Sequence, residues 1–536
     1  MTQIDYQLEL LHTCLAAGDP AALTRWRDAF DEALEGWQLE RARRLLRLVK
    51  AQTLTLQARS LVHYSEGKLL TRLGEWQDAR IAYERALALK RQVGDRWGEV
   101  ATLNALANLL QHGEQPLPEV FGYYQRALEL AAELGDPDGQ AVVLNGMGLV
   151  HYAQGQLDQA QECFVQMQTL AQAQGQRDWE AVALHNLGSI AWARGQLQEA
   201  EAYLSAALDL KRSQHDAHGQ AETLNSLGLV REARGDWQAA VTIYRQSLAI
   251  MQATGDYYGR VQVLVNIGNA VWLMREYEQA LAYYEQAQAI AEELGDVKLE
   301  GQALTGLGDT YRALGRYAEA EAALRRALDL KKAAGDERSL KHTYMSLGAL
   351  YQNQKRLAEA EQAYEQTLRY AIAHGDTRIE AITRYNLGLV ALAQEDFDLA
   401  GSRLKAAEQI ALRGEYRDCL AWVYQALGDL EMMRPAPNAG RVLQCYAEAC
   451  AYAGDFNQAV LDEVLDHLVK LWTAHAEDGR VEEALWFCDS MINLWQETDL
   501  AKGRSDVIGR LQDLRRRLFV SADDIMTLAE TKGNDE

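Results

Sequence analysis

Apolar residues recur along most of this chain at the spacing of a helix face. Within residues 297–336, one stripe at i, i+3, i+4 and i+7 consists of Leu304, Leu307, Gly308 and Tyr311. Gly315 interrupts that stripe, and the second stripe consists of Ala320, Leu324, Ala327 and Leu328, followed by Gly335-Asp336. This period is that of an amphipathic helix and not of a strand. The segment therefore predicts two helices joined by a short turn, with a glycine at the end of the second.

The two-helix pattern returns every 40 residues. A glycine inside the first helix recurs at Gly148, Gly188, Gly228, Gly268, Gly308, Gly348, Gly388 and Gly428, and an alanine in the second recurs at Ala160, Ala200, Ala240, Ala280, Ala320, Ala360 and Ala400. Gly-Asp pairs mark the unit ends, as at Gly255-Asp256 and Gly295-Asp296. A glycine inside a helix costs up to about 1 kcal/mol relative to alanine. Its recurrence predicts that the backbone of a neighbouring helix comes close at each of these positions, in an all-α repeat array.

This pattern resembles the tetratricopeptide repeat, in the long-helix form of kinesin light chain and many bacterial regulators. The resemblance is carried by Leu264, Ile267, Gly268, Val271, Ala280, Tyr284 and Ala287, and again by Tyr344, Leu347, Gly348, Tyr351, Ala360 and Tyr364. It implies an all-α, right-handed superhelical solenoid of about ten helix-turn-helix units. We expect an N-terminal helical cap at 1–55, ten repeats at 56–455, and a degenerate repeat with capping helices and a short tail at 456–536. Caps are expected because a terminal unit has no neighbour to cover one apolar face.

Two units depart from the pattern. In the second unit Asn108 stands in place of the ladder glycine, and the turn contains Pro116 and Pro118. In the tenth unit Pro435 and Pro437 occupy the corresponding turn. We expect locally reshaped turns in units of unchanged length.

Composition narrows the possible functions. The formal net charge of −23 disfavours general binding to nucleic acid. The six cysteines form no CxxC pair or zinc-type cluster with histidine, so we expect buried thiols, no metal and no cofactor. The N-terminus lacks the features of a signal peptide, and no 18-residue apolar segment occurs, so we expect a cytoplasmic protein without membrane contact. Phosphate-loop, HExxH, GxSxG and GxGxxG motifs are absent, so we expect no enzyme activity.

The resemblance implies that the first helix of each unit lines a concave wall that binds a peptide or helix of another protein. The candidate residues lie beside the packing stripe: Asn145, Leu149, Tyr152, His185, Ser189, Trp192, Asn225, Leu229, Asn269, Trp272, Asp309 and Arg312. The aromatic rings are of the type enriched in binding hot spots, and the asparagines offer a donor and an acceptor. We expect a partner segment along units three to six, at about residues 137–296. Arg312 and Asp309 are expected to tune specificity, and His185 is expected to be a hydrogen-bonding contact without a catalytic partner.

Other functions stay open at this stage. One alternative is a ligand-gated peptide sensor resembling bacterial peptide-pheromone receptors. A second is a regulatory subunit of a separately encoded effector, such as a caspase-like protease of a bacterial defence system. A third is DNA binding by residues 21–50, where a basic helix follows a glycine turn, although a capping helix pair accounts for the same segment. The identity of the partner and the oligomeric state are not determined by the sequence.

Overall fold

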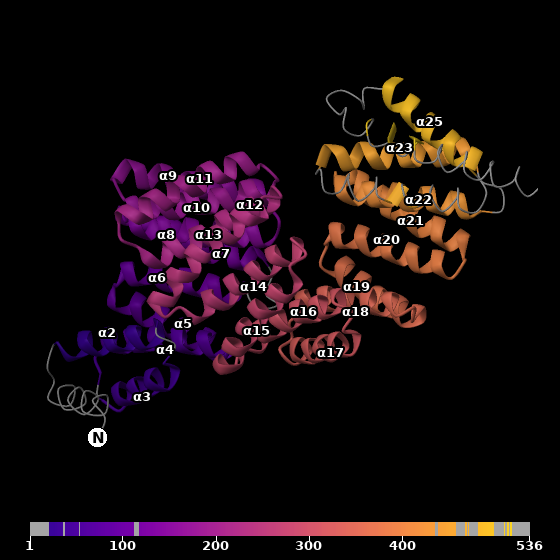
Figure 1. Ribbon diagram of the computed structural model, residues 1–536. Coiled ribbons are helices and arrows are strands. Elements are labelled where there is room, and N and C mark those ends of the chain that lie inside the picture. The colour runs from indigo at the N-terminus through magenta and orange to yellow at the C-terminus, as the bar shows by residue number, and fades with distance from the viewer. Residues whose placement is uncertain are drawn as a thin grey trace, which may run out of the picture. The chain divides into compact units, whose positions relative to one another are not determined.

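The computed structural model describes residues 21–35, 38–52, 54–111, 117–434, 438–456, 467–468, 470 and 481–497, with a few positions between 509 and 516. These described residues form helices and turns, with no strand among them. The chain divides into two compact units, Met1–Arg234 and Gly235–Glu536, which we call the N-terminal and the C-terminal unit. The all-α fold expected from the sequence is confirmed, and Figure 1 labels its helices.

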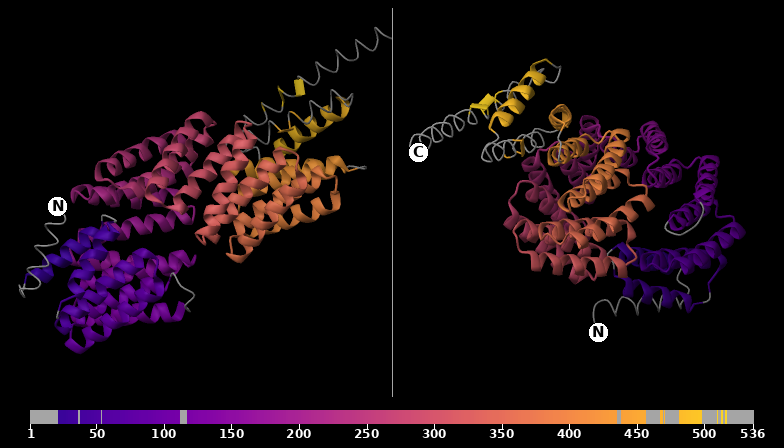
Figure 2. Two further views of the ribbon diagram at one scale, coloured as in Figure 1. Left: turned by 90° about the horizontal axis from the view of Figure 1, so that it is seen from below. Right: turned by 90° about the vertical axis from the view of Figure 1, so that its right-hand side faces the viewer.

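Helices of the N-terminal unit follow one another in antiparallel pairs, visible in Figures 1 and 2. They are α2 (Ala22–Glu35), α3 (Leu39–Lys50), α4 (Leu56–Leu73), α5 (Trp76–Val93), α6 (Arg96–Leu110), α7 (Leu117–Leu134), α8 (Pro137–Ala153), α9 (Leu157–Gln174), α10 (Arg177–Ala193), α11 (Leu197–Ser213) and α12 (Ala217–Ala233). From α4 onward we call the first helix of each pair A and the second B. The even-numbered helices are therefore A helices.

The C-terminal unit continues the same order. It contains α13 (Trp237–Thr254), α14 (Tyr257–Leu273), α15 (Tyr277–Leu294), α16 (Val297–Ala313), α17 (Tyr317–Ala333), α18 (Glu337–Asn353), α19 (Leu357–Ala373), α20 (Thr377–Ala393), α21 (Phe397–Arg413), α22 (Arg417–Met433), α23 (Ala439–Phe456) and α25 (Val481–Glu497). Its A and B helices pack in the pairs α14/α15, α16/α17, α18/α19, α20/α21 and α22/α23. None of the described helices has the length and apolarity needed to cross a bilayer.

The Gly-Asp pairs close one helix and begin the next. Gly255 follows α13 with a φ of 73°, in the left-handed region that glycine adopts without strain. Asp256 then accepts a hydrogen bond from the backbone N–H of Gly259 at 2.9 Å and caps the start of α14. Because one residue ends a B helix and the next begins an A helix, the pair recurs once in most units.

The ladder glycines accommodate a side chain of the paired B helix. A Cβ atom at Gly268 would lie 2.7 Å from Cε1 of Tyr284, which is buried in α15. The sequence predicts a neighbouring backbone at this position, but the ring of Tyr284 occupies the space; a backbone atom lies within 4 Å of the added Cβ at Gly188 and Gly388. The glycine leaves room for the ring, so the A and B helices pack closely.

The expectation of unchanged unit length is also wrong. Gly148 lies twelve residues after Asp136, which caps the start of α8. The residue twelve positions after Asp95, which caps the start of α6, is the fully buried Ala107 and not Asn108. The two caps are 41 residues apart, so the extra residue falls between Ala107 and Leu117. In the tenth pair, α23 begins 22 residues after α22 begins, whereas α21 begins 20 residues after α20. Pro116, Pro435 and Pro437 lie outside the described residues.

The first two described helices form a packed pair. Trp26 and Phe30 are fully buried, and the indole N–H of Trp26 donates to the backbone carbonyl of Leu45 at 2.8 Å. Three of the five basic residues of α3 are paired with acids: Arg41 with Glu32 at 3.6 Å, Arg43 with Glu40 at 2.7 Å, and Lys50 with Glu66. Arg44 and Arg47 are exposed.

Candidate functional site

The twelve candidate residues lie on five successive A helices, and we describe them unit by unit. The N-terminal face consists of Asn145, Leu149 and Tyr152 on α8, His185, Ser189 and Trp192 on α10, and Asn225 and Leu229 on α12. The C-terminal face consists of Asn269 and Trp272 on α14 and Asp309 and Arg312 on α16. Each face combines exposed side chains with side chains that are bound to their neighbours.

Buried lysines recur in every third pair. Lys90, Lys211 and Lys331 are 5%, 4% and 2% exposed, and each ammonium donates to a threonine twelve residues later: Thr102 at 2.9 Å, Thr223 at 3.0 Å and Thr343 at 2.8 Å. Burial lowers the pKa of Lys90 and of Lys331 to about 8. Each lysine thereby links the end of one B helix to the following A helix.

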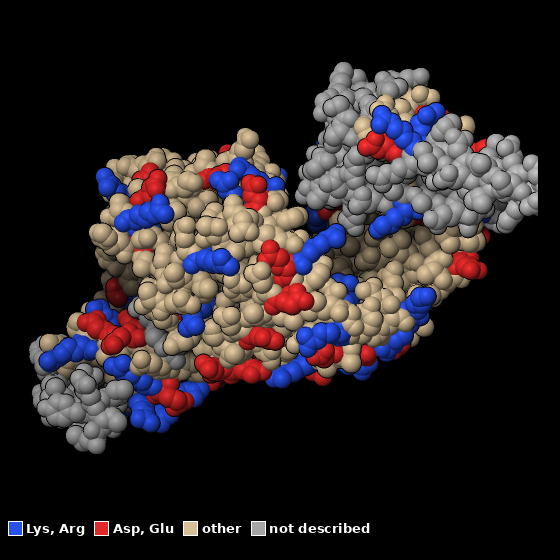
Figure 3. All heavy atoms as spheres, viewed as in Figure 1, with Lys and Arg blue, Asp and Glu red and all other residues tan. Residues whose placement is uncertain are grey.

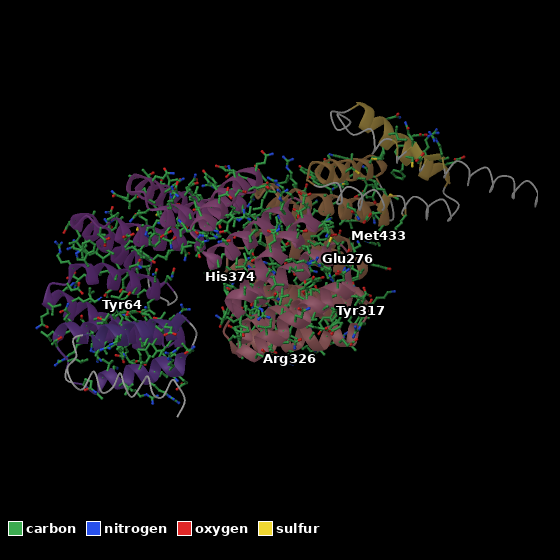
Figure 4. The ribbon with its side chains drawn as sticks, turned by 60° about the vertical axis from the view of Figure 1, so that its left-hand side comes forward. Tyr64, Glu276, Tyr317, Arg326, His374 and Met433 are labelled. Atoms are coloured by element: carbon green, nitrogen blue, oxygen red, sulfur yellow. The ribbon has the colours of Figure 1, made fainter. Side chains whose placement is uncertain are left out.

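The lysines also contact the A helix of their own pair. The ammonium of Lys90 lies 4.3 Å from the ring centroid of Tyr64, whose place in the N-terminal unit is labelled in Figure 4. In the C-terminal unit, Lys331 donates to Thr305 at 3.0 Å. These residues were not among the candidates predicted from the sequence. A Lys-to-Thr spacing of twelve occurs at these three places, 120 or 121 residues apart, but also at Lys298/Thr310 and Lys355/Thr367, so the spacing alone does not single them out.

His185 belongs to one of these linked sets. The hydroxyl of Thr223 donates its only hydrogen to the carbonyl of Gly219 at 2.8 Å and accepts from Lys211. With Thr223 as the acceptor at its 3.1 Å contact with Nδ1 of His185, we assign the hydrogen of the neutral ring to Nδ1. Burial, and then the charge of Lys211, lower the pKa of His185 to about 4. The imidazole is consequently neutral near pH 7, and its Nε2 presents a lone pair with no partner among the described residues.

Two of the candidate asparagines are bound to neighbouring helices. Oδ1 of Asn145 accepts from Nδ2 of Asn186, on the next A helix, at 2.8 Å. Oδ1 of Asn269 accepts from the hydroxyl of Tyr284, in the paired B helix, at 2.6 Å. Asn108 receives the hydroxyl of Tyr124 in the same way. These contacts hold the helices together, and each uses the carbonyl oxygen of the asparagine side chain. Asn225 is half-buried.

Apolar side chains are exposed on the N-terminal face. Leu149 is 45% exposed and Trp192 is 38% exposed. Tyr152 instead packs against the buried cluster around Phe164, and Leu229 is half-buried. Ser189 donates to the backbone carbonyl of His185 in its own helix at 3.1 Å. Leu149 and Trp192 are thus the side chains of this face that offer apolar surface to a partner.

The C-terminal face contains two charged side chains, Asp309 and Arg312, and an indole ring, Trp272. Asp309 accepts from the hydroxyl of Ser346 at 2.7 Å and lies 3.5 Å from Nε of Arg312. Burial raises the pKa of Asp309. Within the part of the chain that the structure describes, neither the buried Nε–H of Arg312 nor the buried indole N–H of Trp272 has a hydrogen-bond acceptor. The ring of Trp272 stands edge-on to Tyr277, with centroids 5.9 Å apart.

Elsewhere the surface charges are interspersed. In the view of Figure 3, lysine and arginine side chains lie among aspartate and glutamate side chains. Arg326, labelled in Figure 4, pairs with Glu292 at 2.9 Å and with Glu300 at 2.5 Å. The pair with Glu292 is exposed and contributes little to stability, whereas Glu300 is buried.

The described residues contain no cluster of metal ligands, and their cysteines are buried. No three histidine, cysteine, aspartate or glutamate side chains there are placed to hold one metal ion. Cys163, Cys419 and Cys450 are buried, and burial raises the pKa of these thiols to about 11, 12 and 12 respectively. Such thiols are poor nucleophiles near pH 7. Cys14 lies outside the described residues.

Comparison with protein families identifies the tetratricopeptide repeat. A model of the tetratricopeptide repeat matches residues 99–173, 179–253, 259–333 and 339–413, and a second model of the same repeat matches residues 67–96. The matched residues amount to more than half of the chain. No curated protein matches the sequence.

Several solved structures are similar to the chain. BtubC from P. vanneervenii is 22% identical, with 41% of this chain and 92% of that chain covered and a TM-score of 0.36. The apo form of the quorum sensor NprR from B. thuringiensis is 14% identical, with 61% and 98% covered and a TM-score of 0.44. A monomeric IFIT1 mutant with Gppp-AAAA is 14% identical, with 78% and 90% covered and a TM-score of 0.47. At these identities the likeness concerns the fold alone.

Proposed function

This chain belongs to the tetratricopeptide-repeat family, and we propose that it is a non-enzymatic scaffold that binds a segment of another protein. We place the binding surface of the N-terminal unit on its N-terminal face, along α8, α10 and α12. The monotonous packing positions build the repeat, whereas the residues of this face differ from helix to helix. A surface that varies on a regular frame suits a ligand whose successive residues differ.

The exposure of Trp192 is the observation that carries this proposal. Tryptophan is among the residue types most enriched in binding hot spots, because its large ring contributes much contact area with little loss of conformational entropy. At the equivalent position in the C-terminal unit, Trp272 is half-buried and packs edge-on to Tyr277. Trp192 instead has 38% of its surface exposed, and Leu149 on the preceding A helix has 45%. Covering both side chains with an apolar group of a partner would remove this surface from water.

His185 adds a polar requirement to the same face. Its neutral ring offers Nε2 as a hydrogen-bond acceptor, because the hydrogen on Nδ1 is used by Thr223. The partner segment should therefore place an N–H or O–H donor next to an apolar side chain. A carboxylate would be a poor match at this position, since two acceptors would face each other.

The experiment is a selection of peptides on the intact protein followed by affinity measurements. Peptides from a displayed random library would be selected on the full chain, and the dissociation constant of the selected peptide would be measured by calorimetry. Trp192→Ala should weaken binding by at least about tenfold, as expected for a hot-spot residue. The melting temperature should remain nearly unchanged because the ring is not part of the core.

Trp97 provides the matched control. It is 55% exposed in the first turn of α6, away from the proposed face. Trp97→Ala should leave the affinity unchanged. The proposal is contradicted if Trp192→Ala lowers the melting temperature strongly and leaves the affinity intact, since Trp192 would then be a packing residue. It is equally contradicted if both tryptophan variants weaken binding to the same extent.

A further inference from the structure

Three sets of polar side chains share one geometry in this array. In each set a buried lysine of a B helix donates to a threonine of the following A helix, as in Lys90/Thr102, Lys211/Thr223 and Lys331/Thr343. A third member lies 26 residues before the lysine, on the A helix of the lysine's own pair: Tyr64, His185 and Thr305. Because the intervals are the same in all three sets, the third member stands at one equivalent position of the fold.

The lysine stands close to this third member. In the last set Lys331 donates to the hydroxyl of Thr305 at 3.0 Å, and in the first set the lysine ammonium lies 4.3 Å from the centroid of the tyrosine ring. The equivalent position places Lys211 next to the ring of His185. The charge of Lys211 acts on the pKa of that ring, which agrees with this placement.

His185 is the third member whose hydrogen bonding depends on where its hydrogen lies. A hydroxyl group can donate and accept at once, whereas a neutral imidazole donates at one nitrogen and accepts at the other. The hydroxyl of Thr223 gives its hydrogen to the carbonyl of Gly219 at 2.8 Å and accepts from Lys211 at 3.0 Å. It can accept from Nδ1 of His185 but has no hydrogen left to donate, so it favours the ring with its hydrogen on Nδ1.

The ammonium of Lys211 opposes a second proton on this ring. Burial, and then the charge of Lys211, lower the pKa of His185 to about 4. Among the described helices around the ring, Lys211 supplies the charge that acts on it, while Asp216 and Glu222 act on Lys211. The lysines of the other two sets have a pKa of about 8. An ammonium in this position therefore keeps its charge below pH 7.

We propose that Lys211 and Thr223 are positioning residues that hold His185 as a hydrogen-bond acceptor at Nε2 for the partner segment. The inference rests on the proposed function, which supplies that partner. The ring is half-buried, and Nε2 is not one of the fully buried, unpartnered atoms of the described residues. This position selects an N–H or O–H donor, and its selectivity does not change as the solution becomes mildly acidic.

Nitrogen NMR of the full chain, labelled at histidine, tests the placement of the hydrogen. The ring nitrogens have distinct signals when Nδ1, Nε2 or both carry a hydrogen, and His185→Ala identifies the signals of His185. The wild type should carry its hydrogen on Nδ1 between about pH 8 and about pH 5.5. Thr223→Val keeps the side-chain shape and removes the acceptor, so the hydrogen should move to Nε2 in a measurable share of the molecules.

The same spectra test the role of the charge. Lys211→Met should raise the pKa of His185 from about 4 to about 5, because a neighbouring positive charge is lost while the burial remains. At about pH 5.5 the protonated share of the rings should then rise from about 3% to about 24%. Lys331→Met is the matched control. It makes the same replacement beside Thr305 and should leave the signals of His185 unchanged.

Affinity for a selected peptide connects this placement to binding. Thr223→Val should weaken the peptide by about threefold or more, because rings with a hydrogen on Nε2 no longer accept from the peptide. In the His185→Ala background the same replacement should have no further effect. Calorimetry on the four variants of this cycle measures the coupling between the two residues.

Several results would overturn the inference. They are a wild-type ring with its hydrogen on Nε2, an unchanged hydrogen position in Thr223→Val, and an unchanged pKa of His185 in Lys211→Met. An equal effect of Lys331→Met on the signals of His185, or an equal loss of affinity in Thr223→Val with and without His185, would show a packing effect instead. The spectra need no partner, so they decide the roles of Lys211 and Thr223 even if Trp192→Ala contradicts the proposed function.

Discussion

The buried Lys331 provides a quantitative test of how this array is held together. Its side chain is 2% exposed and donates to Thr305 at 3.0 Å and to Thr343 at 2.8 Å. Burial lowers its pKa to about 8, whereas a lysine in the unfolded chain has a pKa of about 10.4. Because the pKa is lower in the folded protein, the neutral form of Lys331 favours folding. This contribution to stability is present in full above about pH 10.4 and is lost as the pH falls through about 8. Near pH 7 the folded protein therefore holds a charged ammonium in a poorly solvated position.

Replacing Lys331 by methionine should make the protein more stable near pH 7. The variant removes the buried charge and keeps most of the side-chain volume, and the lowered pKa corresponds to a cost of about 3 kcal/mol for holding that charge in the folded protein. The two threonines would not be left without partners, because they are 3.2 Å apart and Thr305 also donates to the carbonyl of Gly301 at 2.8 Å. The pKa difference corresponds to about 2 kcal/mol of stability gained by the wild type between pH 7 and about pH 9.5. The advantage of the variant should therefore shrink by about 2 kcal/mol over this interval.

The assay is urea unfolding of the full chain, followed by circular dichroism at both pH values. Lys298→Met is the control, since it removes the same charge from an exposed position at the start of α16. Its effect should be small at both pH values. The reasoning is refuted if Lys331→Met is less stable than the wild type near pH 7 and the difference does not change with pH. The hydrogen bonds to the threonines would then outweigh the cost of burying the ammonium.

The remaining predictions concern helix packing, the protonation of His185, and the expected lack of metal binding and hydrolytic activity. Gly268→Ala should lower the free energy of unfolding by about 1–3 kcal/mol in chemical unfolding, because the added Cβ would meet the ring of Tyr284. Gly122→Ala is the control. It should be neutral or stabilising, because no atom lies within 4 Å of the added carbon. The ring of His185 should stay neutral down to about pH 4 by NMR. Because the pKa of His185 is lower in the folded protein, the neutral ring contributes stability that is complete above about pH 6.5 and is lost as the pH falls through about 4. His185→Gln should remove this dependence of stability on acid pH. Chelators should leave the melting temperature unchanged, and the purified chain should hydrolyse neither ATP nor peptides. Metal-dependent melting, or turnover that follows the protein through purification, would contradict these two expectations.

Much of the fold followed from sequence because one packing solution recurs in every pair. An A helix can approach its B helix only where a small residue faces a large one, as Gly268 faces Tyr284. The same constraint acts in each unit, so the glycine ladder appears in the sequence at a fixed interval, and the family and the fold class predicted from it are confirmed. The limits of the caps and of the repeat array stay a prediction. The fixed interval of 40 predicted the wrong equivalent residue in the second unit, which is one residue longer. Asn108 lies 40 residues before Gly148, but Ala107 is the structural equivalent of that glycine.

The role of each polar side chain on the two faces was decided by tertiary structure. Trp192 and Trp272 stand 80 residues apart in equivalent positions, yet one is exposed and the other packs against Tyr277. Asn269 has the same residue type as the other candidate asparagines, but its carbonyl oxygen is used by Tyr284. These differences depend on side chains of neighbouring helices, which lie from five to about forty residues away in the sequence. A repeat fixes where such neighbours stand and leaves their identity free, so whether a polar group is satisfied within the protein or remains for a partner is set only when the helices are packed together.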